Sequence, residues 1–339
     1  MPPIPMPEPM EAKLVSELPA EGDWQFEPKW DGFRAIIRRQ GNAIDILSKS
    51  GKDLARYFPE IVALIAAMQE THLVVDGELV VPIGDMLSFD ALQARLHPAE
   101  SRIKRLSRET PAQLVLFDCL HLGARDFTMA PLSERRRRLE AFHAKHGSAD
   151  LLLSPCSVDR KKAEAWLKAA GGALDGVVAK RRDERYRPGE RAMLKLKQRR
   201  TADCVVGGFR RAKDGQGVGS LLLGLYNDDD KLDHVGFTSG ITDDERMELA
   251  ARLEPLIAKP GFTGKAPGGP SRWNDGNASE WEPLKAELVV EVLYDQITAN
   301  RFRHGTRLLR WRPDKAPGQC RMDQLARELR PSELAAIIV

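Results

Sequence analysis

The sequence has few cysteines, no long apolar run and almost no net charge, and each absence excludes a class of protein. Its four cysteines are far apart, form no CxxC pair and have no histidine at zinc-ligand spacing: Cys119, Cys156, Cys204 and Cys320. We therefore expect free thiols in a reducing compartment and no structural zinc. No apolar run is long enough to span a bilayer, so we expect no membrane association. The proline-rich start lacks the basic and apolar regions of a signal peptide.

The size of the chain predicts two domains, while its overall charge points to no particular partner. The 339 residues are 42% hydrophobic and 30% charged, and the formal net charge is only +3. This composition is typical of a globular protein with sizeable cores. Basic residues outnumber acidic ones from Lys180 to Lys213. That stretch is typical of a surface that binds a polyanion, and a solvated charged face is the alternative.

The first candidate for chemistry is the short segment from Lys29 to Arg34. A lysine amine attacks an electrophile only when unprotonated, so Lys29 needs surroundings that lower its pKa. In one extended segment, Asp31 lies on the same face as Lys29, and Arg34 offers a planar donor fork. Gly32 lets the backbone turn or a ligand approach closely. The alternative is the charged edge of a hairpin.

Further polar residues interrupt apolar strands later in the chain. Glu78 lies in a β-branched run, where a carboxylate needs a cation, a donor set or a metal. Between Asp175 and Lys180, alternation places the carboxylate and the amine on opposite faces. Lys195 and Lys197 lie on the same face of a predicted strand. That face either points inward, where its charges could bind phosphates, or belongs to an edge strand that the lysines keep soluble. Phe117 either stacks on a flat ring or belongs to the core.

Hydrophobic periodicity predicts an α+β fold with two unlike halves. The first half contains strands near 34–39, 43–47, 73–81, 113–120, 174–180 and 193–197, with helices at 132–146 and 158–170 and one that Asp53 caps. The second half contains about five short strands and one helix from 243. This pattern predicts a small barrel of the oligonucleotide-binding (OB) type, with a β-sandwich as the competitor. We place the boundary at Gln198–Thr201, giving domains 1–198 and 199–339.

Six short motifs in a fixed order resemble those of the covalent nucleotidyltransferase superfamily. They are Lys29-Trp30-Asp31-Gly32-Phe33-Arg34, Asp76-Gly77-Glu78, Leu116-Phe117-Asp118, Asp175-Gly176-Val177-Val178-Ala179-Lys180, Lys195-Leu196-Lys197 and Arg312-Pro313-Asp314-Lys315. Together they resemble ATP-dependent DNA ligases, and within these the small stand-alone bacterial ligases of the C type. The resemblance implies a nucleotidyltransferase (adenylation) domain with antiparallel sheets and helices, followed by an OB-fold β-barrel domain. It also implies a bacterial cytosolic or nucleoid location.

The resemblance further implies a mechanism and a set of site residues. Lys29 is the nucleophile that becomes lysyl-AMP, ATP is the nucleotide, and Mg²⁺ or Mn²⁺ is the metal. Glu78 and Asp175 would hold the metal as hard oxygen ligands. The other cofactor contacts would come from Glu27, Asp31, Arg34, Glu78, Phe117, Lys180, Lys195, Lys197, Arg312 and Lys315. Arg34 would bind the ribose and Phe117 the adenine. Lys49 and Arg187 would bind the 5′-phosphate of DNA.

Three departures from the family pattern affect these expectations. Asp175 stands where the family usually has Glu, which shortens a metal-binding arm by one methylene. Lys49 stands where an Arg is usual, which keeps the charge but removes bidentate contact. The first of the six motifs begins at residue 29, so we expect a minimal enzyme without a preceding helical DNA-binding domain. Its second domain would close over ATP about a hinge near Gln198–Thr201 and reopen for DNA.

The predicted function is therefore sealing of 3′-hydroxyl/5′-phosphate breaks in DNA repair. The predicted partners are nicked or broken duplex DNA and repair factors, and the predicted state is a monomer. The alternatives are an RNA ligase, a capping-type nucleotidyltransferase, and a catalytically inactive nucleic-acid-binding protein. Use of GTP would indicate the capping reaction, and absence of any covalent nucleotide would indicate the inactive protein.

Overall fold

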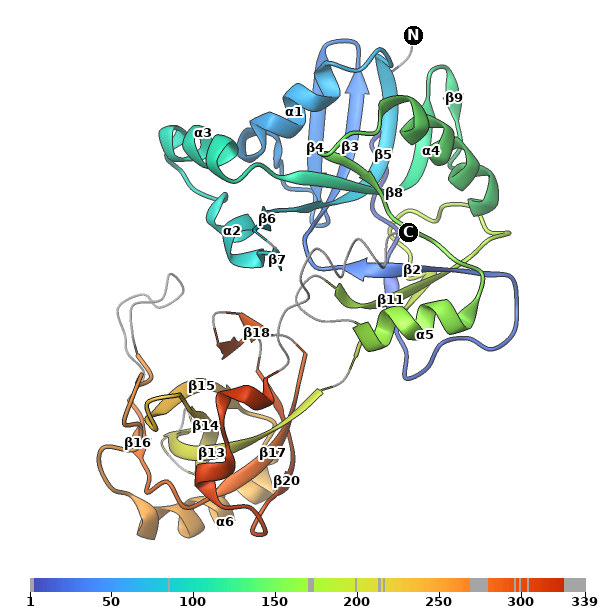
Figure 1. The fold of residues 1–339 in the computed structure, drawn as a ribbon. Coiled ribbons are helices and arrows are strands. Elements are labelled where there is room, and N and C mark those ends of the chain that lie inside the picture. Colours follow the sequence, from blue (N-terminus) through green and yellow to red (C-terminus); the bar gives the residue numbers. More distant parts are fainter. Residues whose placement is uncertain are drawn as a thin grey trace. The chain divides into compact units, whose positions relative to one another are not determined.

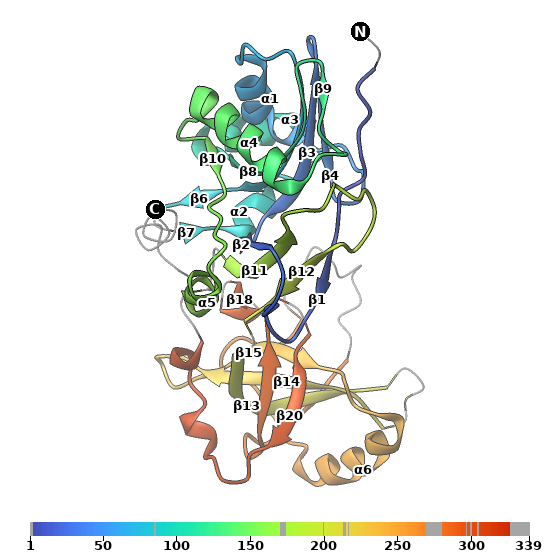
Figure 2. The same cartoon turned by 90° about the vertical axis from the view of Figure 1, so that its right-hand side faces the viewer.

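The chain folds into two compact units, Met1–Gln198 and Arg199–Arg327. A computed structural model describes residues 3–84, 86–169, 174–198, 200–212, 215, 217–268, 280–295, 297–298, 300–303 and 305–325. Both units combine sheets with a few helices (Figures 1 and 2). Residue 199 in the expected hinge and residues 326–339 at the end of the expected second domain lie outside the described residues.

Two mixed sheets form the body of the first unit. One has the order β1 (Ala12–Leu14), β12 (Met193–Leu196), β11 (Leu174–Arg181) and β2 (Trp24–Trp30). The other has the order β10 (Leu151–Leu153), β8 (Gln113–Leu122), β5 (His72–Val80), β3 (Phe33–Gln40) and β4 (Ala43–Ser48), with β9 (Arg125–Asp126) beside β8. A small pair, β6 (Pro82–Ile83) and β7 (Met86–Leu87), follows β5. Pairing is antiparallel except for β1 with β12 and β10 with β8.

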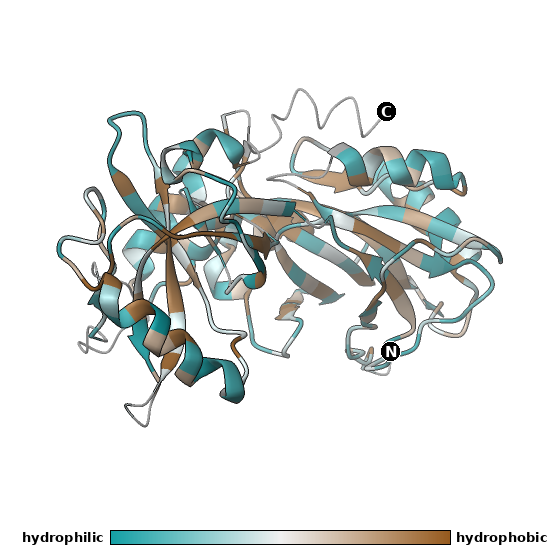
Figure 3. Cartoon of the chain, turned by 90° about the horizontal axis from the view of Figure 1, so that it is seen from below, coloured by the Kyte–Doolittle hydropathy of each residue, from teal (hydrophilic) through white to brown (hydrophobic). Residues whose placement is uncertain are grey.

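Helices pack on these sheets through their apolar residues. The helices are α1 (Pro59–Ala66), α2 (Phe89–Ala94), α3 (Glu100–Glu109), α4 (Leu132–His146) and α5 (Arg160–Ala169). The helix α4 packs on β8 and β10, and α5 packs on β11 and β2. Hydrophobic residues are frequent on the strands, and the helices mix hydrophobic with many hydrophilic residues (Figure 3). The predicted helices at 132–146 and 158–170 are confirmed.

The predicted cap at Asp53 is wrong. Its carboxylate accepts the amide of Ala55 at 2.8 Å and so starts a 3₁₀ turn, Ala55–Tyr57. The helix α1 begins later, at Pro59, because proline lacks the amide hydrogen that a first helical residue leaves unpaired anyway.

A buried ion pair crosslinks the core of the first unit. The guanidinium of Arg135 on α4 donates to both oxygens of Asp118 on β8, at 2.8 and 3.0 Å. Their side chains are only 1% and 2% exposed. Burial alone would raise the pKa of Asp118, but Arg135 outweighs it and lowers that pKa. The pair therefore stabilises the fold above the ordinary aspartate pKa, and this stabilisation is lost as the pH falls below it.

Within its described residues, the second unit contains one six-stranded antiparallel sheet and one α-helix. The sheet has the order β15 (Leu232–Thr238), β14 (Val218–Tyr226), β13 (Arg200–Arg211), β17 (Val289–Tyr294) and β20 (Arg307–Trp311), with β16 (Glu282–Pro283) beside β13. A hairpin, β18 (Ile297–Thr298) and β19 (Arg301–Phe302), accompanies it. The helix α6 (Asp243–Leu253) starts with a capping box between Thr242 and Glu245. The five strands and the helix expected here are confirmed.

The cysteines and the helices were the basis of two expectations drawn from composition. All four cysteines carry free thiols, and Cys119, Cys204 and Cys320 are buried. In the parts of the chain that the structure describes, no helix has the length and apolar character needed to cross a bilayer.

Candidate active site

The segment around Lys29 turns a corner instead of continuing as one strand. Lys29 lies on β2 in the four-stranded sheet, whereas Arg34 lies on β3 in the other sheet. The single extended segment expected from the sequence is therefore wrong. A Cβ on Gly32 would collide with the carbonyl of Leu79, so the corner requires glycine. Through this corner, one short segment supplies side chains to both walls of a cavity.

That cavity, of about 1040 Å³, lies within the first unit. Its lining includes eight of the predicted site residues: Glu27, Lys29, Arg34, Lys49, Glu78, Phe117, Lys180 and Lys195. Cross-strand pairing explains the convergence, because Val178 of β11 lies opposite both Glu27 of β2 and Lys195 of β12. Directly opposed residues point to the same face of a sheet. In the second sheet, Arg34 lies opposite Glu78.

A bulge brings Asp175 to the candidate nucleophile. The register shifts between Leu174 and Gly176, and the carboxylate of Asp175 lies 2.7 Å from the Lys29 amine and 3.0 Å from the Lys197 amine. Gly176 has a φ of +140°, and a Cβ there would collide with the Leu196 carbonyl. Simple alternation placed Asp175 on the face opposite Lys180, away from this group. That prediction is wrong because the bulge redirects the side chain.

The charges around Lys29 do not activate it in this state. Burial disfavours its ammonium form, but the carboxylates of Asp175 and Glu78 outweigh burial and raise the pKa of Lys29. The expectation of a lowered pKa is thus wrong for the protein without nucleotide. Lys195 differs, because burial and the nearby amines of Lys29 and Lys197 lower its pKa. Attack by Lys29 therefore requires a change in its electrostatic surroundings.

The side-chain carboxylate of Glu78 lines the cavity and is disfavoured in its charged form. Burial raises its pKa to about 7, although Lys29 and Arg34 act in the opposite direction. It makes no ion pair or hydrogen bond with any residue that the structure describes. Nor do the described residues contain a cluster of three or more His, Cys, Asp or Glu side chains able to hold a metal. Glu78 and Asp175 are the hard oxygen ligands that would hold a divalent cation here, and its charge would compensate the buried carboxylate of Glu78.

Phe117 offers a flat surface between two cations. The guanidinium of Arg34 lies 5.2 Å from the centre of its ring, and the Lys180 amine lies 4.6 Å from it. Lys180 is also bonded to Glu27 at 2.8 Å, and both side chains are buried. The other oxygen of Glu27 accepts a hydrogen bond from the side-chain amide of Gln25 at 2.8 Å. This corner of the cavity therefore has a ring face beside a neutralised polar pair, which suits a purine base.

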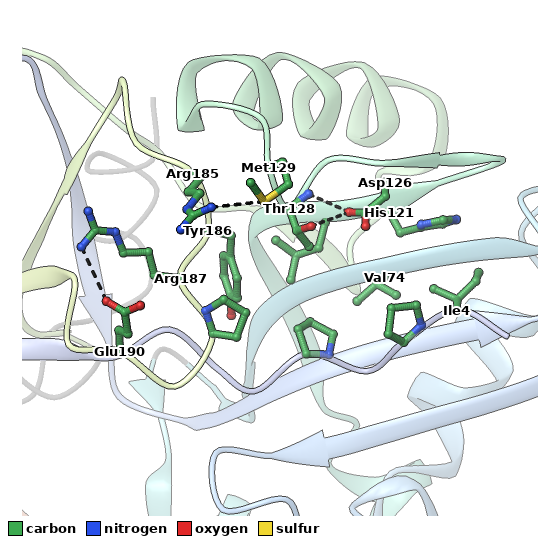
Figure 4. Close-up of a pocket in the computed structure, with 14 residues that line it drawn as sticks. Ile4, Val74, His121, Asp126, Thr128, Met129, Arg185, Tyr186, Arg187 and Glu190 are labelled. Atoms are coloured by element: carbon green, nitrogen blue, oxygen red, sulfur yellow. Dashed lines mark hydrogen bonds and ion pairs between the residues drawn. The ribbon is translucent and has the colours of Figure 1, made fainter.

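The two predicted ligands of the DNA 5′-phosphate lie apart. Lys49 lines the cavity and lies 3.1 Å from Glu11. Arg187 lies 3.3 Å from Glu184 and 3.5 Å from Glu190, and it lines a different cavity of about 410 Å³ (Figure 4). The structure does not bring Arg187 together with Lys49.

The remaining predicted residues fall into two groups. Asp31, at the corner, adds negative charge near Lys29 and Glu78. Arg312 and Lys315 belong to the second unit, where both bind Asp203, at 2.8 and 2.7 Å. Asp203 is not predicted as a site residue, because nothing near it in the sequence marks it as a partner of residues more than a hundred positions later.

Comparison with known proteins follows the same division of the chain. Residues 9–197 match the family model "ATP dependent DNA ligase domain", and residues 214–315 match "ATP dependent DNA ligase C terminal region". The chain is 46% identical over 336 residues to DNA ligase C1 of Mycolicibacterium smegmatis, covering 96% of this chain and 94% of that one. It is 42% identical over 346 residues to DNA ligase C of Mycobacterium tuberculosis, covering 97% and 95%. A solved structure from work on Lig E DNA ligases shares the fold, with a TM-score of 0.53, 13% identity and coverage of 89% and 100%.

Proposed function

The chain belongs to the ATP-dependent DNA ligase family, and we propose that it seals 3′-hydroxyl/5′-phosphate breaks in duplex DNA through AMP carried on Lys29. The observation that carries this proposal is the position of the Lys29 amine. It lies in a large cavity lined by Glu78, Phe117 and several lysines, and it forms an ion pair with Asp175. We propose that the first unit is the adenylation domain and the second the OB-fold domain.

The reaction proceeds in three transfers. The unprotonated Lys29 nitrogen attacks the α-phosphorus of ATP, the bond to pyrophosphate breaks, and pyrophosphate leaves. An oxygen of the DNA 5′-phosphate then attacks that phosphorus, and Lys29 leaves as the amine. Finally the 3′-hydroxyl attacks the activated 5′-phosphate, loses its proton and releases AMP. Positioning and charge neutralisation dominate such phosphoryl transfers, which accounts for the cations around the cavity.

The side chains divide this work by position. We assign the ribose to Arg34 and the base to Phe117, with Glu27 recognising the edge of the base. Lys180, Lys195 and Lys197 neutralise phosphate charge, and Lys49 receives the DNA 5′-phosphate. Arg187 keeps its proposed DNA role only as a contact outside the cavity. Arg312 and Lys315 lie on the second unit, so we propose that they act on ATP when the domains close.

Glu78 and Asp175 fit a divalent metal such as Mg²⁺ or Mn²⁺. Both supply hard oxygen ligands, and Glu78 has no cationic partner of its own among the described residues. A bound divalent ion would supply charge neutralisation to the phosphates of ATP. Asp175 has a second task in the protein itself, because it holds Lys29 through an ion pair at 2.7 Å.

Covalent labelling tests the proposed function. The protein is mixed with Mg²⁺ and ATP labelled on the α-phosphate, denatured, and examined for retained label, with GTP and NAD in parallel. We expect label from ATP alone, and its release as AMP when nicked DNA is added. Label from GTP would indicate a capping-type enzyme, and label released only by nicked RNA would indicate an RNA ligase. No label from any nucleotide would exclude the enzyme.

Replacing Asp175 with Asn should shift the pH dependence of adenylylation. Asp175 raises the pKa of Lys29, so the variant should hold a larger unprotonated fraction at any given pH below that pKa. The rising acidic limb of kcat/KM for ATP, which reports the free enzyme, should therefore move to lower pH. The maximal rate should fall on the order of 10²-fold, because the variant loses one of the two carboxylates proposed to hold the metal that neutralises phosphate charge.

Asp45→Asn is the matched control for this shift. Asp45 is a partly exposed carboxylate of the same unit that pairs with Arg38 at 2.8 Å. Its profile should coincide with that of the unaltered protein. If the acidic limb of the D175N profile stays at the same pH or moves to higher pH, Asp175 does not set the protonation of Lys29.

A further inference from the structure

An N-terminal arm, residues Ile4–Leu14, belongs to the first unit and contacts the cavity of about 1040 Å³ that contains Lys29. Glu11 and Ala12 of the arm line that cavity, and β1 at its end pairs in parallel with β12, which carries Lys195. Ile4, at the other end, lines the separate cavity of about 410 Å³ (Figure 4). The backbone of Ile4 is fixed at both groups, since its amide donates to Gln40 at 3.1 Å and its carbonyl accepts from Arg38 at 2.8 Å.

In the middle of the arm, four residues from four segments form a closed ring of hydrogen bonds. The amide of Met10 donates to the Tyr186 hydroxyl at 2.9 Å, and that hydroxyl donates to Asp76 at 2.9 Å. Asp76 accepts both the Nε and an Nη of Arg34. The other Nη of Arg34 donates to the carbonyl of Met10 at 2.7 Å, which completes the ring.

The ring fixes the guanidinium of Arg34 in one orientation. A guanidinium has five N–H groups, and three of them are bonded inside the ring. The two N–H groups that remain are one on each Nη, and they lie in the guanidinium plane whose orientation Asp76 and Met10 already set. Asp76 is fully buried and Tyr186 is 2% exposed, so these contacts form away from water and are not readily exchanged for it.

We infer that Tyr186 and the backbone of Met10 are positioning residues for nucleotide binding, acting through Asp76 on Arg34. The inference rests on the proposed function, since it requires Arg34 to hold ATP. Tyr186 never touches the cavity that contains Lys29; it lines the outer cavity among Thr128 and Arg187 (Figure 4). Its ring packs in an apolar cluster with Ile4, Met10, Ile36, Val74, Leu120 and Met193. The hydroxyl is thus the part of Tyr186 that serves the site.

The test is Tyr186→Phe, which removes the hydroxyl and keeps the ring in its apolar cluster. Rates of lysyl-AMP formation are measured against ATP concentration for the unaltered protein, Y186F, Arg34→Ala and the double variant. We expect Y186F to raise KM for ATP roughly tenfold, because the amide of Met10 and a carboxylate oxygen of Asp76 each lose a partner. The kcat should change far less, since no reacting atom is involved.

The double variant distinguishes positioning from a general structural role. If Tyr186 acts through Arg34, Y186F should add nothing to the KM of R34A. A KM effect that persists at full size in the R34A background would overturn the inference.

Tyr226→Phe is the matched control. Tyr226 is a partly buried tyrosine of the second unit whose hydroxyl makes no hydrogen bond within the described part of the chain. Its KM should be unchanged. If the unaltered protein forms no lysyl-AMP, the proposed function fails; if it does and Y186F has an unchanged KM, the inference alone fails.

Discussion

Replacing Lys29 with Ala should lower the rate of protein adenylylation by on the order of 10⁴-fold or more, because the nucleophile itself is removed. Lys29→Arg should be equally inactive, although it keeps a positive charge beside Asp175, since a guanidinium stays protonated and does not attack. Comparing the two variants separates the loss of the amine from the loss of its charge. The measurement is retained label from ATP labelled on the α-phosphate.

The same variants should still join DNA that already carries AMP on its 5′-phosphate. In that last transfer the 3′-hydroxyl attacks the 5′-phosphate and AMP leaves, so no bond to Lys29 forms or breaks. Lys145→Ala is the matched control, because Lys145 is an exposed lysine of the same unit paired with Glu70 at 2.7 Å. Label retained by K29A would identify a different nucleophile. Failure of K29A on adenylylated DNA would show that Lys29 also serves the last transfer.

The largest effect on stability is expected for Arg135→Ala. This change leaves the carboxylate of Asp118 buried without its cation and frees the carbonyl of Ala130, which Arg135 now binds at 2.7 Å. Removing one partner of a buried pair costs about 3–5 kcal/mol, much more than the pair itself contributes. The free energy of unfolding should therefore fall by about this amount in urea titrations at neutral pH, in the transition of the first unit.

An exposed ion pair supplies the control for this variant. Arg160 pairs with Glu164 one helical turn away at 2.9 Å, and the two side chains are 41% and 47% exposed. Arg160→Ala should cost less than about 1 kcal/mol, because solvent screens the pair. The R135A deficit should also shrink at acid pH, where Asp118 in the variant becomes protonated and its charge no longer needs a partner. A loss of less than about 1 kcal/mol for R135A would contradict the proposed importance of the buried pair.

The local sequence pattern is sufficient to predict the strands and helices and most of the residue types at the site. Strand and helix periods do not depend on distant residues, so α4, β11 and the strands of the second unit follow directly from hydrophobic spacing. The chemistry of Lys29, Glu78 and the paired lysines Lys195 and Lys197 was visible for a similar reason. A charged residue inside an apolar strand is expensive unless it has a task, and this holds before any fold is known.

What only the tertiary structure decided is which of these groups meet and how their charges balance. Alternation misplaced Asp175 because a bulge depends on the neighbouring strands, and the corner at Gly32 depends on the Leu79 carbonyl of another strand. The sequence predicts a low pKa for Lys29, but the pKa is raised, since the carboxylates of Asp175 and Glu78, brought from separate segments, outweigh burial.

The hydrogen bonds that hold Arg34 are the clearest example of contacts that the sequence does not predict. Met10, Asp76 and Tyr186 are separated by up to 176 residues, and no spacing in the sequence relates them. Sequence determined the kinds of groups that this protein brings to nucleotide chemistry, because residue type alone sets charge, nucleophilicity and strand or helix preference. The fold decided their partners, because a hydrogen bond or an ion pair depends on distances that only the packed chain defines.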